Sequence, residues 1–151
     1  MRILSRRGVL VLAAWIGACG PGFAQQAASA SGTRIALDGY DPVSYFDPGR
    51  PEKGSRKFSF AFDDAVYWFK SADHRGKFAA DPERYAPQFA GYCALTLARG
   101  EKAQADPEAW AIADGKLYVF GSKLGIPDFK ANTADIISNA NSNWQKLRQS
   151  K

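Results

Sequence analysis

Hydrophobic and polar residues alternate regularly in two parts of the chain. In residues 57–69 the alternation places three aromatic side chains on one face, and the polar pair Asp63-Asp64 interrupts the run (the aromatics are Phe58, Phe60 and Phe62). A second run, residues 110–120, has Asp114-Gly115 at its centre. Period-two alternation on both sides of a polar turn predicts a β-hairpin in each case, and Asp-Gly favours a tight type I′ turn.

Two other segments predict helices. Ser71 is a helix N-cap residue, and the helix that follows it should stop before Pro82 with His74 and Phe78 on one face. Near the C-terminus the period changes to 3.6, which predicts an amphipathic helix that docks on the sheet through one apolar face (Ala134, Ile137, Ala140, Trp144 and Leu147). Residues 89–97 are apolar around Gly91, which is typical of either a buried strand with a bulge or a short helix.

These elements predict one α+β domain. We expect a small single domain of antiparallel β-hairpins packed on a short helix and a C-terminal amphipathic helix. Asp41 precedes Pro42 and should therefore be extended, at the entry to a strand or a sheet edge. No internal repeat is visible in the sequence.

The N-terminal residues have the composition of an export signal. Arginines precede an uncharged apolar run too short for an ordinary membrane span, and residues 5–12 (SRRGVLVL) are similar to a twin-arginine signal. Small residues before Gln25 favour cleavage after Ala24, whereas residues 16–19 (IGAC) resemble a lipoprotein box that would anchor the protein to a membrane through Cys19. We therefore expect a signal peptide at 1–24, a flexible linker at 25–33, a domain at 34–151 and a periplasmic location, either soluble or lipid-anchored.

The charge of the exported protein is modest. The signal holds three of the 20 Lys and Arg residues and none of the 15 Asp and Glu residues, so the remainder carries 17 minus 15, or +2. It has no basic cluster interleaved with aromatic residues, which makes nucleic acid an unexpected partner. Removal of the signal leaves Cys93 as a single thiol, which in an exported protein is buried, a ligand, or paired with another molecule.

Recognisable catalytic constellations are missing from the chain. It has one histidine, His74, and no GxSxG, HExxH or phosphate-cradling glycine loop. We therefore expect no enzyme. A thiol-dependent enzyme or redox protein using Cys93 remains an alternative, since His74 could meet Cys93 in the fold.

Three segments carry a resemblance to a known family. The stretch DPV at 41–43, the stretch WFKSADHRGKFAADPERYAP at 68–87 and the stretch GYCA at 91–94 resemble the exported bacterial YHS domain-containing proteins, within the wider YHS and TRASH-like metal-binding group. In metal-binding relatives the corresponding motifs contain cysteine ligands. The positions of those cysteines are here occupied by Ser44, Lys70 and His74, so the ligand cysteines are largely replaced.

The resemblance implies a binding or accessory module that is not an enzyme. A reduced metal site built from His74 and Cys93, with Tyr92 or Asp41 as further ligands, would suit copper or zinc, because imidazole and thiolate are ligands of these soft ions. A protein partner is the other class of ligand that this interpretation allows. The alternative is a structural or protein-interaction module without metal, in which Cys93 is buried.

Overall fold

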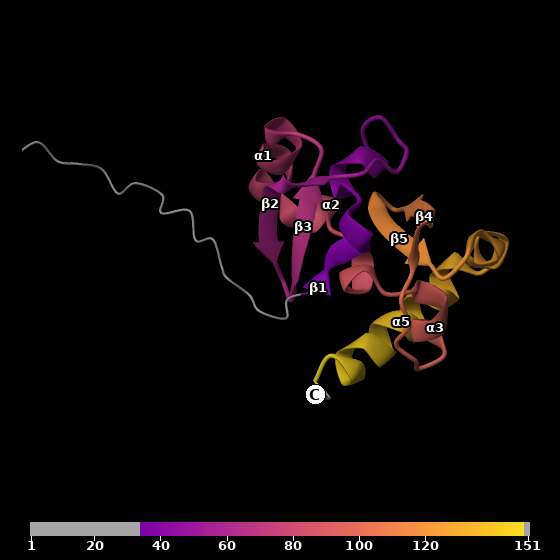
Figure 1. Ribbon diagram of the computed structural model, residues 1–151. Coiled ribbons are helices and arrows are strands. Elements are labelled where there is room, and N and C mark those ends of the chain that lie inside the picture. The colour runs from indigo at the N-terminus through magenta and orange to yellow at the C-terminus, as the bar shows by residue number, and fades with distance from the viewer. Residues whose placement is uncertain (1–33, 150–151) are drawn as a thin grey trace, which may run out of the picture.

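The structure, a computed structural model, describes residues 34–149 and contains two small sheets (Figure 1). The expected signal peptide and linker lie outside the described residues. One sheet has the strand order β1-β3-β2, with β1 parallel and β2 antiparallel to β3, and the other pairs β4 with β5 in antiparallel register. The strands are β1 (Arg34–Ile35), β2 (Ser55–Phe62), β3 (Ala65–Phe69), β4 (Asp106–Ala113) and β5 (Lys116–Phe120).

Short helices surround the sheets, and the expected α+β class is confirmed. The α-helices are α1 (Ala72–Ala80), α2 (Pro82–Tyr85), α3 (Ala94–Ala98), α4 (Ile126–Ala131) and α5 (Thr133–Leu147). The 3-10 helices are η1 (Ala36–Gly39), η2 (Pro42–Tyr45), η3 (Gln88–Gly91) and η4 (Lys123–Gly125). Within residues 34–149, no helix has the length and apolar character needed to cross a bilayer.

Both hairpins and the helix after Ser71 agree with the sequence pattern. Asp114 and Gly115 have φ values of 50° and 70°, as a type I′ turn requires. The strand alternative for residues 89–97 is wrong: this segment forms η3 and α3. Asp41 is extended as expected, yet it caps the 3-10 helix η2 rather than entering a strand, because its side chain accepts a hydrogen bond from the backbone of Val43.

The C-terminal helix is present but its buried face differs from the expected one. Ile136 and Ala140 are buried in α5, with Ile137 and Trp144 partly buried against the same cluster. Ala134 is exposed, so its assignment to the packing face was wrong. The buried residues of α5 begin at Ile136, about one turn after the start of the helix.

The two halves of the domain contain similar helices and a hairpin in the same order along the chain. Residues 34–85 contain η1, η2, the β2–β3 hairpin and α1, and residues 86–147 contain η3, α3, the β4–β5 hairpin and α4. The strand register shifts between Ser55 and Ser59 in one hairpin and between Asp106 and Trp110 in the other, 51 positions later (106 minus 55, 110 minus 59). Figure 1 shows the halves side by side, the first in indigo and magenta, the second in orange and yellow.

The turn that opens each half has the same unusual backbone. Leu37 and Asp38 have φ values of 52° and 47°, and Phe89 and Ala90 have 55° and 52°; in both turns a glycine with positive φ follows. Non-glycine residues rarely adopt this left-handed conformation. Two such turns in one domain are therefore a strong sign of a structural repeat.

The aromatic cores of the halves also correspond. Phe78 packs on Tyr67 and Phe69 with ring centroids 4.9 and 5.1 Å away. Phe129, 51 positions after Phe78 (129 minus 78), packs on Tyr118 and Phe120 at 5.2 and 4.9 Å. A third cluster joins the halves, with Leu37 and Tyr45 from the first and Leu117 and Val119 from the second.

The sequence-based view that the chain has no internal repeat is therefore wrong at the level of structure. Few identical residues remain at equivalent positions, among them the Gly-Tyr pairs at 39–40 and 91–92. The core aromatics Tyr67, Phe69 and Phe78 recur as Tyr118, Phe120 and Phe129, whereas other equivalent positions differ in size, as Phe58 and Ala109 do.

Candidate functional site

Asp41 is the most tightly held polar side chain at the candidate site. It is fully buried, and its carboxylate accepts the backbone N–H of Val43 at 2.9 Å and that of Lys70 at 3.0 Å. The Nδ1 atom of His74 lies 2.7 Å from the same carboxylate oxygen that Lys70 contacts. The carboxylate thereby connects η2, the end of β3 and α1, and its negative charge is compensated by three donors.

His74 is positioned by the start of α1. The Ser71 hydroxyl caps this helix by accepting the His74 backbone N–H, which fixes the first turn. An ionised carboxylate only accepts hydrogen bonds, so Nδ1 of His74 is the protonated nitrogen and donates to Asp41. In the neutral ring, Nε2 then carries a free lone pair.

The Nε2 atom of His74 reaches the protein surface. Among residues 34–149, no buried side-chain nitrogen or oxygen lacks a hydrogen-bond partner, and Nε2 has no partner there. Nε2 is therefore not fully buried, although His74 as a residue is only 6% exposed. Asp41 thus orients a nearly buried ring so that one nitrogen faces outward.

Ser44 and Lys70, two positions that hold cysteine in metal-binding relatives of the resembled family, have structural partners. The Ser44 hydroxyl donates to the Asp41 carbonyl at 2.7 Å and accepts the Glu52 N–H at 3.1 Å. The Lys70 ammonium forms an ion pair with the Glu52 carboxylate. Hydrogen bonds from Lys70 and then Arg50 hold the pKa of Glu52 below its usual value, so the charge of Lys70 is balanced at neutral pH.

Cys93 lies in the apolar core of the second half. It is 3% exposed, and its Sγ accepts the Gly121 N–H at 3.2 Å. This contact reproduces the one between Asp41 and Lys70, because Gly121 follows Lys70 by 51 positions. The Cys93 N–H donates to the Ala103 carbonyl at 3.0 Å, just as the Asp41 N–H donates to Glu52. Cys93 is therefore the apolar counterpart of Asp41.

The second half has no counterpart of the imidazole. Gly125 takes the place of His74, 51 positions later (125 minus 74), and a Cβ atom there would lie 2.3 Å from Leu95. Leu95 fills the space that a side chain would need. The polar site therefore exists in the first half, whereas the equivalent place in the second half is packed with apolar atoms.

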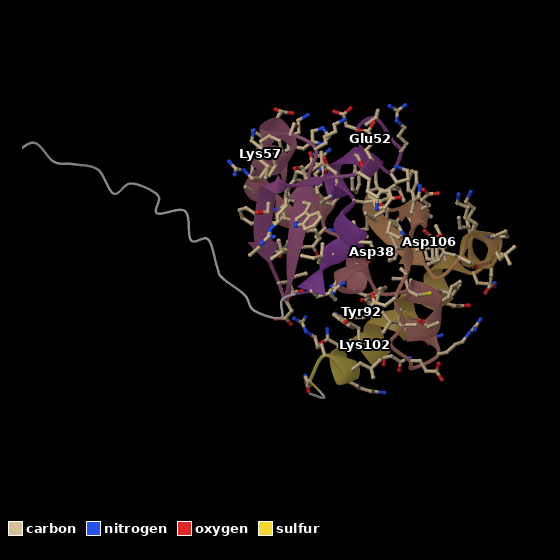
Figure 2. All side chains as sticks on the ribbon, viewed as in Figure 1. Asp38, Glu52, Lys57, Tyr92, Lys102 and Asp106 are labelled. Atoms are coloured by element: carbon tan, nitrogen blue, oxygen red, sulfur yellow. The ribbon has the colours of Figure 1, made fainter. Side chains whose placement is uncertain are left out.

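The structure brings His74 together with Asp41 but not with Cys93. Figure 1 places α1, which carries His74, and α3, which Cys93 precedes, at opposite ends of the molecule. Figure 2 likewise shows Glu52, beside the Asp41 site, well apart from Tyr92, the neighbour of Cys93. Tyr92 lies under the cations of Arg34 and Lys102 rather than beside His74. Within residues 34–149 no three His, Cys, Asp or Glu side chains form a group that could hold a metal.

Comparisons of the chain with protein-family models, curated proteins and solved structures found no match. The YHS resemblance and the metal ligands that it implies therefore remain predictions. Sequence reasoning treated Asp41 as a secondary ligand and missed that it orients His74. The Asp-Pro pair indicates that Asp41 caps a helix, since an aspartate before a proline at the first helical position is a favoured N-cap, but it does not indicate the contact with His74.

Proposed function

We propose that this protein is a non-enzymatic binding or accessory module of YHS type that acts in the periplasm, with His74 as its contact residue. The observation that carries the proposal is the 2.7 Å contact between Asp41 and Nδ1 of His74, which leaves Nε2 facing solvent. A buried carboxylate that fixes an imidazole is the usual support of a metal-binding histidine.

A soft metal ion, copper or zinc, is the ligand that this chemistry favours. The carboxylate fixes the tautomer and the orientation of the ring, and imidazole suits both ions. Lys70 opposes a cation less than its charge alone suggests, because Glu52 neutralises it. One imidazole leaves the remaining coordination positions to a partner or a small ligand, which agrees with an accessory role rather than a closed structural site.

Metal retention in matched variants tests the proposal. His74→Asn places an amide nitrogen near the position of Nδ1, keeping a donor for Asp41, but removes Nε2. We expect the wild type, purified from the periplasm, to retain copper or zinc by elemental analysis, His74→Asn to lose it, and Cys93→Ser to retain it. Equal and negligible metal in all three proteins would eliminate the metal function, and loss in Cys93→Ser alone would make Cys93 the ligand instead.

A structural or protein-interaction module without metal is the second candidate. It is favoured by the three donors that Asp41 receives, because such a buried network stabilises a fold whether or not a ligand binds. If this candidate is correct, neither the wild type nor any variant should contain metal, and His74→Ala should lower the free energy of unfolding.

The thiol-dependent alternative depends on access to Cys93. A thiol in an apolar core that accepts a backbone N–H should react with a thiol reagent only after denaturation. Rapid reaction of Cys93 in the native protein would favour a redox protein over both binding modules.

A further inference from the structure

A second candidate site lies where the two halves meet. A cavity of about 230 Å³ is lined by residues from β2, β3 and α2 of the first half and from η3, β5 and α5 of the second. It does not include Asp41, His74 or Cys93. Its volume is close to the lower end of small-molecule sites, so it suits a compact ligand.

Tyr67 lines this cavity, and its hydroxyl group is not fully buried. Its side chain is 1% exposed, its ring packs on Phe78, and the hydroxyl has no hydrogen-bond partner among residues 34–149. Because no fully buried side-chain oxygen in that part of the chain lacks a partner, the Tyr67 hydroxyl must have some solvent exposure. Burial raises the pKa of Tyr67 to about 12, so the group stays protonated at neutral pH and can donate a hydrogen bond.

One wall of the cavity consists of backbone in a strained conformation. Phe89 and Ala90 both line the cavity and both have positive φ, which costs about 1 kcal/mol or more for each residue. The Arg34 guanidinium holds this wall by donating a hydrogen bond to the Ala90 carbonyl. The wall is therefore fixed before any ligand arrives.

The rim carries one carboxylate and one ammonium that are not paired with each other. Glu83 has no ion-pair partner within residues 34–149, and the Lys116 ammonium donates only to the Glu83 backbone carbonyl, at 3.3 Å. Asp63, also on the rim, is paired with Arg148 at 3.5 Å. Phe62 and Trp144 also line the cavity.

We propose that this cavity binds a small zwitterionic molecule, of which an α-amino acid is the simplest example. The ammonium of the ligand would meet Glu83, its carboxylate would meet Lys116, and a polar group on its side chain would reach the Tyr67 hydroxyl. Opposite charges on the rim select a zwitterion over a simple amine or acid, because each of these leaves one rim charge without a partner.

Titration of the mature protein with L-tyrosine and L-phenylalanine, followed by calorimetry or NMR, tests this inference. The two amino acids differ by one hydroxyl group that could meet Tyr67. We expect saturable binding with Kd about 1 mM or tighter, as small ligands of this size reach. Tyr67→Phe should weaken binding of L-tyrosine by about 2–10-fold, and Glu83→Gln or Lys116→Gln should weaken binding of both by about 2–5-fold.

Tyr118→Phe is the matched control for Tyr67→Phe. Tyr118 occupies the equivalent position in the second half, 51 residues later (118 minus 67), and is not among the cavity-lining residues. The Tyr118→Phe variant should bind both amino acids like the wild type. Absence of saturable binding at about 10 mM, equal loss in Tyr118→Phe, or equal affinity for 2-phenylethylamine, 3-phenylpropionate and L-phenylalanine would overturn the inference. None of these results depends on metal content, so the proposed function of His74 stands or falls separately.

Discussion

Replacing Asp41 with asparagine should destabilise the domain strongly, because no orientation of the amide can accept all three donors. If its oxygen faces Lys70 and His74, its NH₂ group faces the Val43 N–H, and a flipped amide opposes the other two donors. One orphaned N–H costs about 1–3 kcal/mol, and the two remaining bonds lose their charge assistance, about 1 kcal/mol each. The carboxylate's own desolvation cost is removed, which leaves a net loss of about 2–4 kcal/mol.

Urea unfolding followed by tryptophan fluorescence measures this loss. With a urea m-value of about 2 kcal/mol per molar, the midpoint should fall by roughly 1–2 M. Cys93→Ala is the control from the second half: it removes the acceptor of one N–H, that of the exposed Gly121, and should shift the midpoint less than half as far. An Asp41→Asn midpoint equal to that of the wild type, or a larger shift in Cys93→Ala, would refute the role assigned to the carboxylate.

Three further predictions concern packing, titration and backbone. Phe78→Ala and Phe129→Ala should each lower the unfolding free energy by about 3–5 kcal/mol in urea titrations, because both rings are buried at the centre of their half. The pKa of Tyr67 is raised from 10.0 to about 12, so its contribution to stability is complete below pH 10 and lost as pH rises through 12; Tyr67→Phe should reduce that alkaline loss. Gly39→Ala should lower the thermal unfolding midpoint more than Gly49→Ala. Both glycines have positive φ, but only at Gly39 would the new Cβ collide, 2.6 Å from an indole carbon of Trp68.

The fold was predictable where local sequence determines it. The alternation in residues 57–69 and 110–120 and the cap at Ser71 led to the observed hairpins and to α1, because turn chemistry and periodicity act over a few residues. Residues 89–97 were ambiguous because a left-handed turn at Phe89 and Ala90 has no propensity signal: neither residue favours positive φ. The surrounding packing imposes that turn.

The sequence indicates His74 as a candidate contact residue but not its pairing. It suggests His74 and Cys93 as the soft ligands of the domain, and nothing local indicates that 33 positions separate His74 from its partner, Asp41. The hydroxyl of Tyr67 was missed for a related reason. A tyrosine in an aromatic strand is expected to be a core residue, and only the position of its oxygen beside the cavity distinguishes it.

The repeated architecture explains why the halves differ in chemistry. In each half a residue after Gly-Tyr accepts the N–H that follows the second strand of the hairpin, a structural requirement that either a carboxylate or a thiol can meet. A buried carboxylate needs further hydrogen-bond donors, and His74 supplies one at Asp41. The Cys93 thiol needs no further donor, so Leu95 can pack against Gly125 in the equivalent place. The first half therefore holds an imidazole beside its charged acceptor, and a binding partner should be sought at the surface around His74.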